Sequence, residues 1–400
     1  MPGPLDGIRI LDFCVLQNGG YATAMLADMG AEVVKIEDPV KGDPARAILG
    51  RGRAAELGIG AYFEANNRNK KAMTLDLKKE KGREVFYRLV EKADVVATNL
   101  RVHVPRQLGF DYETLVKHNP RIIFAHSTGY GRHGPDAGEM VYDLLGLARG
   151  GMTVSMTVPG EPPVYTSGGI ADQVGAMMLA HAIVLALFAR ERTGRGQRVD
   201  VSQLGSVMML QGLGLYTHAV TGSSNPPYRP DKAGNPLYSY HRGQDGRWFA
   251  LSCPQPDRFW GQVCDVLGMQ RIKDDPRFAT LSARSQHTPE LIRMMDEAIA
   301  TRPAAEWVQR FKGCGIPATL VQDYSDLFTD PQVVANNYVV DFEHPVIGKL
   351  KIPGIPIQLG ATPGEVRTAG PQYGEHTHEV LLAAGYSWDD IASFHDEGVI

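Results

Sequence analysis

Short apolar runs alternate with helical patterns over the first third of the chain. Four runs have the length and apolar content of buried strands, at residues 8–13, 32–37, 94–99 and 121–126. Helical spacing of apolar residues separates them, at residues 20–31, 82–93 and 111–119. Strand, helix and strand repeated in this order favour right-handed crossovers and a mostly parallel sheet. The pattern predicts a doubly wound, Rossmann-like α/β large domain.

One later stretch, residues 173–190, is apolar enough to resemble a membrane span. It is barely long enough to cross a bilayer, it contains Gln173 and His181, and no second such stretch accompanies it. A helix in the interior of a domain is also apolar on all sides. We therefore expect a buried core helix and no membrane partner.

The second half of the chain has a different pattern. Residues 221–235 are rich in Pro, Gly and polar residues and indicate a linker. Two strand patterns then surround the turn Asp245-Gly246, and helical patterns follow at residues 257–267, 288–300 and 303–312. This order predicts a smaller α+β domain over residues 236–320. The three prolines within residues 344–360 favour edge strands or extended chain.

Composition limits the class of protein. The 400 residues are 43% hydrophobic and 22% charged, with a formal net charge of −4. These values are typical of a soluble globular protein of two structural units, and they give no electrostatic reason to expect nucleic acid as a partner. The four cysteines lack the close spacing of a zinc or disulfide motif, and the first residues lack a basic, apolar leader. A cytoplasmic location is expected.

Common cofactor and catalytic motifs are missing. The first strand–helix–strand unit ends in Glu37-Asp38, as a dinucleotide-binding unit does, but G-x-G-x-x-G does not follow the first strand. Walker, HExxH and GxSxG motifs are also missing, and the twelve histidines show no metal-ligand spacing. The sequence predicts neither a metal site nor a bound cofactor.

Asp172 is the clearest candidate for chemistry. It follows Gly168-Gly169 and precedes the long apolar helix. Aspartate is a preferred residue at the N-cap of a helix, which would explain it structurally. The helix dipole also favours an ionised carboxylate there, which is the state that a carboxylate nucleophile requires. The two interpretations are compatible.

Basic residues near the predicted strand ends are the other candidates. Lys70, Lys71, Arg101 and Arg106 could together supply cations for a phosphate-bearing ligand, although each alone is more typical of a solvated surface charge. His126 and Tyr130 flank the exit of the strand at 121–126, where a histidine can be either structural or catalytic.

Several blocks of the sequence resemble the class III CoA-transferase family, which includes formyl-CoA, carnitine, bile-acid and aryl-lactate CoA-transferases and the related α-methylacyl-CoA racemases. The blocks occur in order along nearly the whole chain, and they are PLDGIRILDF, GGYATAMLADMGAEVVKIEDPVKGDPAR, LGFDYETLVKHNPRIIFAHSTGYGRHGP, GGIADQVGA, ARERTGRGQRVDVS and GEHTHEVLLAAGY.

The resemblance implies roles for particular residues. The catalytic aspartate of the family falls on Asp172, and its CoA-binding positions fall on Leu16, Gln17, Lys71, Leu75, Arg106 and Tyr130. The family's substrates are an acyl-CoA thioester and a small carboxylic acid, with CoA carried through a covalent aspartyl intermediate. The resemblance further implies an interlocked homodimer in which residues 321–400 return to the large domain, whose first segment is residues 1–220.

Two departures from the family pattern affect the choice of function. A run of glycines that covers the intermediate in some transferases is reduced to Ala233-Gly234-Asn235-Pro236, which disfavours a formyl/oxalate enzyme. The Gly-His-Asp triplet of the racemases is Val141-Tyr142-Asp143 here, so one member of the acid/base pair that a racemase needs is missing. CoA transfer is therefore favoured over a racemase and over a non-catalytic CoA-binding protein. Among the acids that could be exchanged, the resemblance favours 2-hydroxy or aryl acids.

Overall fold

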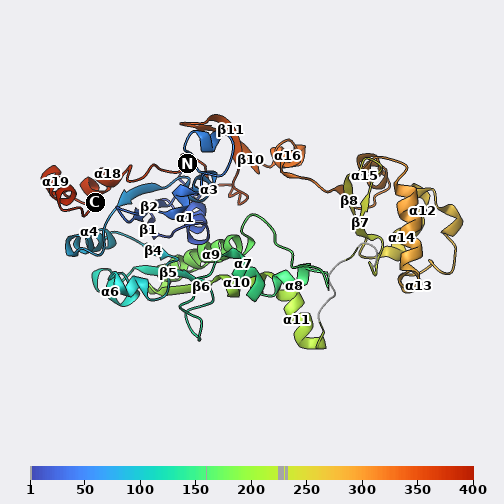
Figure 1. Ribbon diagram of the computed structural model, residues 1–400, viewed down its shortest axis with the longest axis horizontal. Coiled ribbons are helices and arrows are strands. Elements are labelled where there is room, and N and C mark those ends of the chain that lie inside the picture. The colour runs from blue at the N-terminus through green and yellow to red at the C-terminus, as the bar shows by residue number, and fades with distance from the viewer. Residues whose placement is uncertain (1, 159, 224–228, 230–232) are drawn as a thin grey trace. The chain divides into compact units, whose positions relative to one another are not determined.

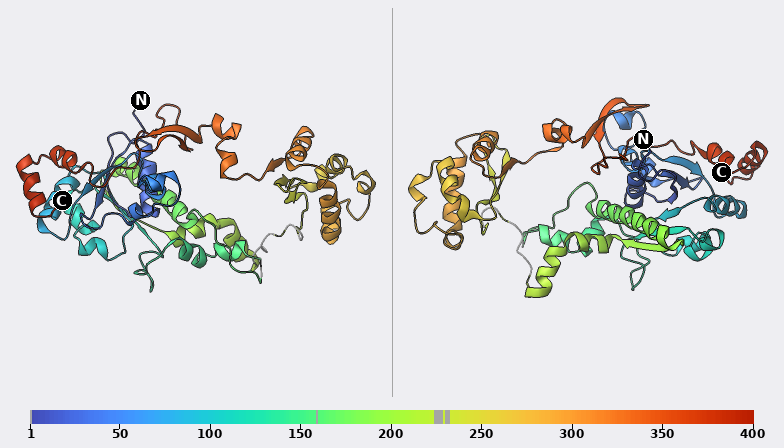
Figure 2. Two further views of the ribbon diagram at one scale, coloured as in Figure 1. Left: turned by 45° about the horizontal axis from the view of Figure 1, so that its top comes forward. Right: turned by 180° about the vertical axis from the view of Figure 1, so that it is seen from behind.

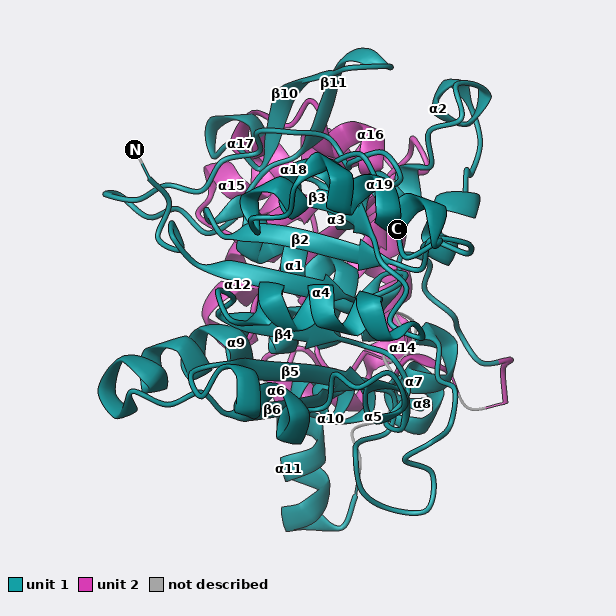
Figure 3. Cartoon of the chain, turned by 90° about the vertical axis from the view of Figure 1, so that its left-hand side faces the viewer, with its two compact units in different colours: residues 1–155, 163–225, 334–400 teal, residues 156–162, 226–333 magenta. Residues whose placement is uncertain are grey.

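The computed structural model describes residues 2–158, 160–223, 229 and 233–400. The chain forms two compact units, which have different colours in Figure 3. Unit 1 comprises residues 1–155, 163–225 and 334–400, and unit 2 comprises residues 156–162 and 226–333. Unit 2 therefore continues past residue 320, the predicted end of the small domain. Most of the predicted linker, residues 224–228 and 230–232, lies outside the described residues.

A six-stranded, entirely parallel sheet forms the centre of unit 1, in the order β3-β2-β1-β4-β5-β6 (Figure 1). The strands are β1 Arg9–Phe13, β2 Glu32–Glu37, β3 Lys71–Thr74, β4 Val95–Thr98, β5 Ile123–Thr128 and β6 Arg198–Ser202. The sheet confirms the predicted α/β class, with the strand order of a doubly wound fold. β3 and β6 were not predicted, because β3 has only two apolar residues, Ala72 and Met73, and β6 alternates polar and apolar residues.

Helices cover both faces of this sheet (Figures 1 and 2). Leu11 and Val34 point to one face, where apolar side chains of α4, α6, α18 and α19 pack. Ile10 and Val33 point to the other face, which α1 and α9 cover. These helices are α1 Asn18–Asp28, α4 Glu80–Val90, α6 Tyr112–His118, α9 Ile170–Thr193, α18 Thr377–Ala383 and α19 Trp388–Asp396.

Shorter elements complete unit 1. They are η1 Pro44–Ala47, α2 Arg53–Glu56, α3 Ala61–Asn67, α5 Val104–Gln107, α7 Asp143–Arg149, α8 Met152–Met156, α10 Gln203–Leu210, α11 Gly212–Thr221 and α17 Pro331–Ala335 where the units meet in sequence. The proline-containing segment forms an antiparallel hairpin in which β10 Val339–His344 pairs with β11 Gly348–Pro353. The two strands form a separate two-stranded sheet, as expected for a segment whose prolines disfavour a central strand.

Helix α9 corrects one prediction. It is long and apolar enough to cross a membrane by length and composition, and it packs against α1, β5 and β6 on one side. Its other side is not buried within the chain: Met177, Leu185 and Phe188 are all more than half exposed. The expectation of a helix buried on all sides was wrong for the single chain, because α9 covers the sheet as an outer layer.

Unit 2 has its own hydrophobic core between a small sheet and a group of helices. The sheet order is β7-β8-β9, with both pairs antiparallel and the Asp245-Gly246 turn between the first two strands, as predicted. The elements are β7 Tyr238–Arg242, β8 Trp248–Ser252, α12 Pro256–Leu267, η3 Gln270–Ile272, α13 Leu281–Gln286, α14 Thr288–Ile299, α15 Ala304–Gly313, β9 Ala318–Leu320 and α16 Tyr324–Leu327.

Candidate active site

Two adjoining cavities lie at the carboxyl ends of the parallel strands. One, of about 280 Å³, includes Asp172, and the other, of about 190 Å³, includes Leu75. Val15 and Leu100, which follow β1 and β4, line both. The strand order reverses between β1 and β4, and ligands of doubly wound sheets bind at such a switch point. The cavities are therefore where the fold favours a ligand site.

Buried charges fix the loop that follows β1. Lys35 Nζ lies 2.7 Å from the Asp43 carboxylate and donates to the Cys14 carbonyl at 2.7 Å, and the Leu16 amide donates to Asp43 at 3.1 Å. Burial alone would lower the pKa of Lys35, but the charges of Asp43 and Asp12 outweigh it and raise that pKa. Leu16 is held at φ 58°, a left-handed conformation that needs such support.

The residue after Leu16 reaches the start of helix α9. Gln17 Nε2 donates to the Gly168 carbonyl at 3.1 Å. Gly169 has φ 72°, and a Cβ there would lie 2.6 Å from Gln17 Oε1. Gly169 is therefore required both by the backbone conformation and by the side chain packed against it. The Gly168-Gly169 pair and Gln17, which the sequence analysis named separately, are therefore in direct contact.

Asp172 is the third residue of α9 and does not cap it. The N-cap is Gly169, and no side chain caps from that position. Instead Asp143, at the start of α7, accepts hydrogen bonds from the amides of Ala171 at 2.7 Å and Asp172 at 3.1 Å. The cap interpretation of Asp172 was therefore wrong. Its side chain is free to line the cavity, where its Oδ1 accepts a hydrogen bond from Gln203 Nε2.

The surroundings of Asp172 work against its ionisation. Burial is the largest effect and, with the nearby charge of Asp143, raises its pKa from 3.8 to about 6, while the hydrogen bond from Gln203 acts in the opposite direction. Within the described part of the chain, no lysine or arginine contributes to this shift. A carboxylate with this pKa is still mainly ionised at neutral pH, yet it is poorly solvated and reactive.

Two tyrosines stand near the carboxylate pair. Burial, followed by the charges of Asp172 and Asp43, raises the pKa of Tyr62, which lines the Asp172 cavity. Burial, followed by the charge of Asp143 and a hydrogen bond to it, raises the pKa of Tyr165. Both phenols therefore stay neutral, and each offers an aromatic face and one hydroxyl.

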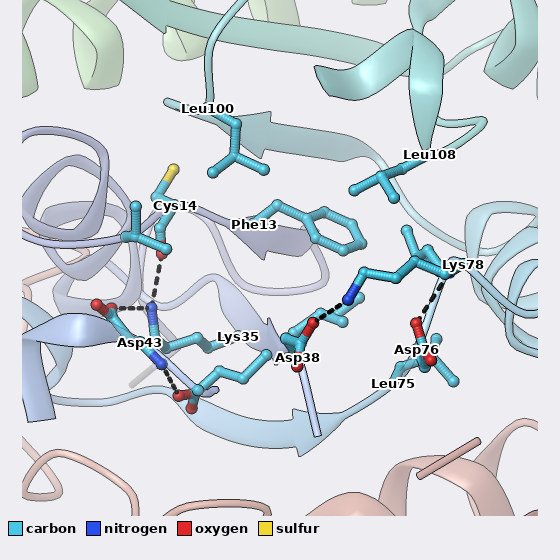
Figure 4. Close-up of a pocket in the computed structure, with 15 residues that line it drawn as sticks. Phe13, Cys14, Lys35, Asp38, Asp43, Leu75, Asp76, Lys78, Leu100 and Leu108 are labelled. Atoms are coloured by element: carbon cyan, nitrogen blue, oxygen red, sulfur yellow. Dashed lines mark hydrogen bonds and ion pairs between the residues drawn. The ribbon is translucent and has the colours of Figure 1, made fainter. Parts of the chain in front are cut away.

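The second cavity, drawn in Figure 4, is an apolar slot with a charged rim. Phe13, Leu75, Leu100 and Leu108 supply its apolar walls. At the rim, Lys78 Nζ lies 2.7 Å from Asp38 and its side chain is 63% exposed. The apolar walls suit a flat heterocycle, while the lining also contains the carboxylates of Glu37, Asp43 and Asp76.

The structure brings five of the predicted residues together. Asp172, Leu16, Gln17 and Arg101 line one cavity, and Leu75 lines the adjoining one. Lys71 is not among them. It begins β3 at the amino edge of the sheet, paired at 2.9 Å with both Glu32 and Glu379, and it lines neither cavity, so its predicted contact with CoA stays a prediction. Its neighbour Lys70 is fully buried and paired with Asp12.

Arg106 and Tyr130 lie close to the cavities without lining them. Arg106 is on the exposed side of α5, within the segment 100–108 that contributes to both walls. The Tyr130 ring packs under the guanidinium of Arg149 at 4.2 Å. His126 is buried and its Nε2 lies 2.6 Å from the Leu100 carbonyl, which makes it a support for the cavity wall.

Sequence reasoning missed Gln203, Lys78 and the capping role of Asp143. Gln203 begins α10, directly after β6, and no local pattern connects it to Asp172, 31 positions earlier. Lys78 stands in the charged run LKKEKGRE, where one lysine looks like the next. Among the described residues no three His, Cys, Asp or Glu side chains gather in a way that could hold a metal ion.

Residues 5–377 match the model of CoA-transferase family III. The chain belongs to this family. It is therefore a CoA-transferase. The match includes the whole carboxyl edge of the sheet and both cavities.

Characterised relatives support the assignment. An acyl-CoA transferase of Fusarium pseudograminearum is 33% identical over all of this chain and 88% of its own length. An acetyl-CoA:oxalate CoA-transferase of Acetobacter aceti is 32% identical over 89% of each chain, and a (R)-2-hydroxy-4-methylpentanoate CoA-transferase of Clostridioides difficile is 28% identical over 99% of each.

Solved structures agree with this fold. A CAIB/BAIF family protein from Brucella suis superposes with a TM-score of 0.84, at 27% identity, over 96% of this chain and 100% of its own. A hypothetical protein from Mycobacterium tuberculosis superposes with a TM-score of 0.81, at 30% identity, over 94% of this chain and 98% of its own. The arrangement of elements around the two cavities thus recurs in experimental structures of this fold.

Proposed function

We propose that the chain transfers coenzyme A between carboxylic acids through covalent intermediates on Asp172. A carboxylate oxygen of Asp172 attacks the thioester carbonyl carbon, the carbon–sulfur bond breaks, and CoA leaves as the thiolate. The thiolate then adds to the aspartyl carbonyl of the mixed anhydride and displaces the donor acid as its carboxylate. The acceptor carboxylate attacks this aspartyl thioester, and the same steps in reverse release the new acyl-CoA.

The position of Asp172 is the observation that carries this proposal. The side chain lines a cavity at the switch point of the sheet, and Asp143 has taken over the structural task of capping α9. Partial burial leaves the carboxylate weakly solvated, which makes it a stronger nucleophile than an exposed aspartate. Every step exchanges one anion for another, so the site needs no proton donor for the leaving group.

The adjoining slot supports a placement for the CoA moiety. The adenine ring suits the walls formed by Phe13, Leu75, Leu100 and Leu108, with Lys78 at the rim for a phosphate. The pantetheine arm would then pass Val15 and Leu100, which both cavities share, and bring the thioester to Asp172. This placement uses neither Lys71 nor the amino edge of the sheet.

The electrostatics beside Asp172 favour an acid without a second charge. Tyr62 and Tyr165 are neutral, and Arg101 lines the same cavity, but no cation of the described residues contributes to the Asp172 pKa. We therefore expect monocarboxylates with a neutral body, such as the 2-hydroxy acid in the name of the C. difficile relative, to be better acceptors than oxalate. Higher kcat/KM with oxalate than with (R)-2-hydroxy-4-methylpentanoate would contradict this expectation.

The alternative activities gain less support. A racemase needs an acid and a base on opposite sides of the α-carbon, and the described lining of the Asp172 cavity contains no histidine, with Tyr142 at the triplet position. A non-catalytic CoA-binding protein would have no use for a buried carboxylate beside the cavity, because such a group destabilises the fold.

The exposed apolar surface of unit 1 supports an obligate homodimer. We call the outward-facing apolar side chains of α9, α10 and α11 the outer surface, and its largest members are Met177, Leu185, Phe188, Met209, Leu210, Leu213, Tyr216 and Val220. Large apolar patches on soluble proteins commonly mark interaction surfaces. Under this proposal a second copy of the chain covers the outer surface, and the two chains interlock as the family resemblance implies.

The direct test of the mechanism is a search for the adduct. Wild-type enzyme incubated with acyl-CoA and then with hydroxylamine or borohydride should be modified on the peptide that contains residues 168–178. Asp172→Asn should give no adduct and lose several orders of magnitude in turnover, since an amide cannot act as the attacking carboxylate. A fully active Asp172→Asn variant, together with an unmodified wild-type peptide, would overturn the mechanism.

A further inference from the structure

The nucleophile of the proposed mechanism has one hydrogen-bond partner that the family resemblance does not supply. Gln203 is the first residue of α10, held there by the Ser202 cap, whose Oγ accepts from the Gly205 amide at 3.0 Å. Its side chain is 4% exposed and lines the Asp172 cavity. A carboxylate can only accept hydrogen bonds, so the amide nitrogen of Gln203 is the atom that faces Asp172 Oδ1.

The other end of the same amide is left unsatisfied. Gln203 Oε1 is buried and has no hydrogen-bond partner among the described residues. A buried acceptor without a partner destabilises the fold, so proteins keep one only where something else is gained. The oxygen lies against helix α7, where a Cβ on Gly146 would be in ordinary van der Waals contact with it at 3.6 Å.

We propose, resting on the aspartyl mechanism above, that Gln203 is a catalytic residue whose amide stabilises the oxyanion formed on Asp172 itself. When the mixed anhydride forms, Oδ2 becomes the bridging oxygen and Oδ1 remains the aspartyl carbonyl oxygen. The CoA thiolate then adds to Cγ, and the π electrons of that carbonyl move onto Oδ1, towards which the Gln203 N–H already points. Collapse restores the carbonyl and expels the donor carboxylate with Oδ2.

The same contact serves the return half of the cycle. The acceptor carboxylate adds to Cγ of the aspartyl thioester, the negative charge again develops on Oδ1, and collapse expels the thiolate. A hydrogen bond to an oxyanion is stronger than one to a neutral carbonyl oxygen, so the Gln203 amide stabilises these transition states more than the intermediates on either side. Its contact with the free carboxylate also orients Oδ2 for the first attack and opposes the rise in the Asp172 pKa.

The variant Gln203→Met tests this role, because methionine keeps the length of the side chain without a donor. Loss of one oxyanion donor typically lowers turnover by about 10²–10³-fold. We expect a fall of about that size in kcat, little change in KM for acyl-CoA, and an acidic limb of the pH–rate profile shifted upwards from about 6. Gln203→Asn, which keeps an amide but withdraws it from Asp172, should lie between wild type and Gln203→Met.

Gln211→Met is the matched control. Gln211 follows the same helix, and its Nε2 donates to the backbone carbonyls of Gly150 and Val207 instead of to Asp172. It should retain wild-type turnover and pH profile. A structural effect of lost glutamine packing would lower the activity of both variants and leave the position of the acidic limb unchanged, which would overturn the proposal.

Adduct mapping separates failure of this inference from failure of the mechanism. A wild-type peptide 168–178 that never becomes modified would remove the aspartyl mechanism and the role of Gln203 with it. Wild-type adduct formation combined with unchanged kcat and pH profile in Gln203→Met would remove the role of Gln203 alone. If Gln203→Met does not fold, Gln203→Asn decides: wild-type kcat and an unmoved acidic limb would overturn the proposal.

Discussion

At the scale of single residues, Asp172 is kept ionised in surroundings that favour its protonated form. Its pKa of about 6 lies above the 3.8 of a solvated aspartate, so the folded state binds a proton more readily than the unfolded chain does. Stability therefore falls as the pH rises from about 4 to about 6, and the loss is complete above that range. A difference of about two pKa units corresponds to about 3 kcal/mol. Function and stability conflict at this residue.

Asp172→Asn should therefore be more stable than wild type at pH 8, by up to about 3 kcal/mol, since asparagine removes the buried charge and retains an oxygen for Gln203. The advantage should disappear below about pH 4, where wild-type Asp172 is protonated. Urea unfolding midpoints measured from pH 4 to pH 8 would check this. An Asn variant that is less stable than wild type at pH 8 would contradict the assignment of the raised pKa.

Substitutions of Lys78 and Lys71 test whether the nucleotide part of CoA binds in the slot or at the amino edge of the sheet. Under the proposed placement of CoA, Lys78→Ala should raise KM for acyl-CoA with little change in kcat, because it would remove a phosphate contact that is equally strong in ground and transition states. Lys71→Ala is the control, since Lys71 pairs with Glu32 and Glu379 and lines neither cavity. Steady-state kinetics at two salt concentrations would compare them. A larger KM effect at Lys71 would relocate the nucleotide site.

At the scale of elements, helix α9 packs closely against the loop after β1, and glycines make this close packing possible. Gly169 adopts φ 72° and leaves no room for a Cβ beside Gln17. Further along the helix, a Cβ on Gly175 would lie 2.3 Å from Asn18 Nδ2, and Asn18 itself donates to the Asp172 carbonyl at 3.4 Å. Glycines thus set the distance between the nucleophile helix and the loop that carries Gln17.

The two ends of α9 offer a matched pair of substitutions. Gly169→Ala and Gly194→Ala both place a side chain in a left-handed conformation, at φ 72° and 70°, which costs roughly 1–2 kcal/mol. At Gly194 none of the described residues lies within 4 Å of a Cβ, whereas at Gly169 the Cβ meets Gln17. Similar thermal destabilisation is expected in both, with a large loss of kcat only in Gly169→Ala. Equal kcat in the two variants would show that the Gln17 approach is unimportant.

At the scale of the whole molecule, the single chain leaves part of its hydrophobic surface uncovered. Phe188 of α9, Met209 of α10 and Leu213 of α11 are 57%, 64% and 83% exposed. Burial of apolar area gives about 25 cal/mol per Å², so association over three helices would supply a large favourable term. If the subunits interlock, the interface over these helices forms during folding, and the subunits cannot separate without unfolding.

Interlocked subunits should not exchange. Two versions of the enzyme with different affinity tags, mixed in their native state, should give no hybrid dimer after days, whereas mixing in denaturant followed by refolding should give hybrids. Sedimentation at nanomolar concentration should show dimers alone. Rapid native exchange would indicate an ordinary dimer, and folded monomers on dilution would remove the proposal of an obligate dimer.

The sequence by itself determined the class of fold and many of the longer elements, and it singled out Asp172 as the candidate nucleophile. Strands at 8–13, 32–37, 94–99 and 121–126 were predictable because buried strands must be apolar and short, and such signals are local. Asp172 was recognisable because its glycine neighbours are local too. The family resemblance, confirmed over residues 5–377, added the chemistry.

Only the tertiary structure decided which charges meet and which faces are covered. Lys70, Lys71 and Lys78 look alike in sequence, yet one is buried against Asp12, one is paired at the amino edge and one borders the slot, because the register of β3 fixes their positions. Gln203 reaches Asp172 because β6 ends beside α9, a contact across 31 positions. The apolar pattern of α9 gave its helix but not its exposed side, since periodicity records hydrophobicity and not the partner that covers it.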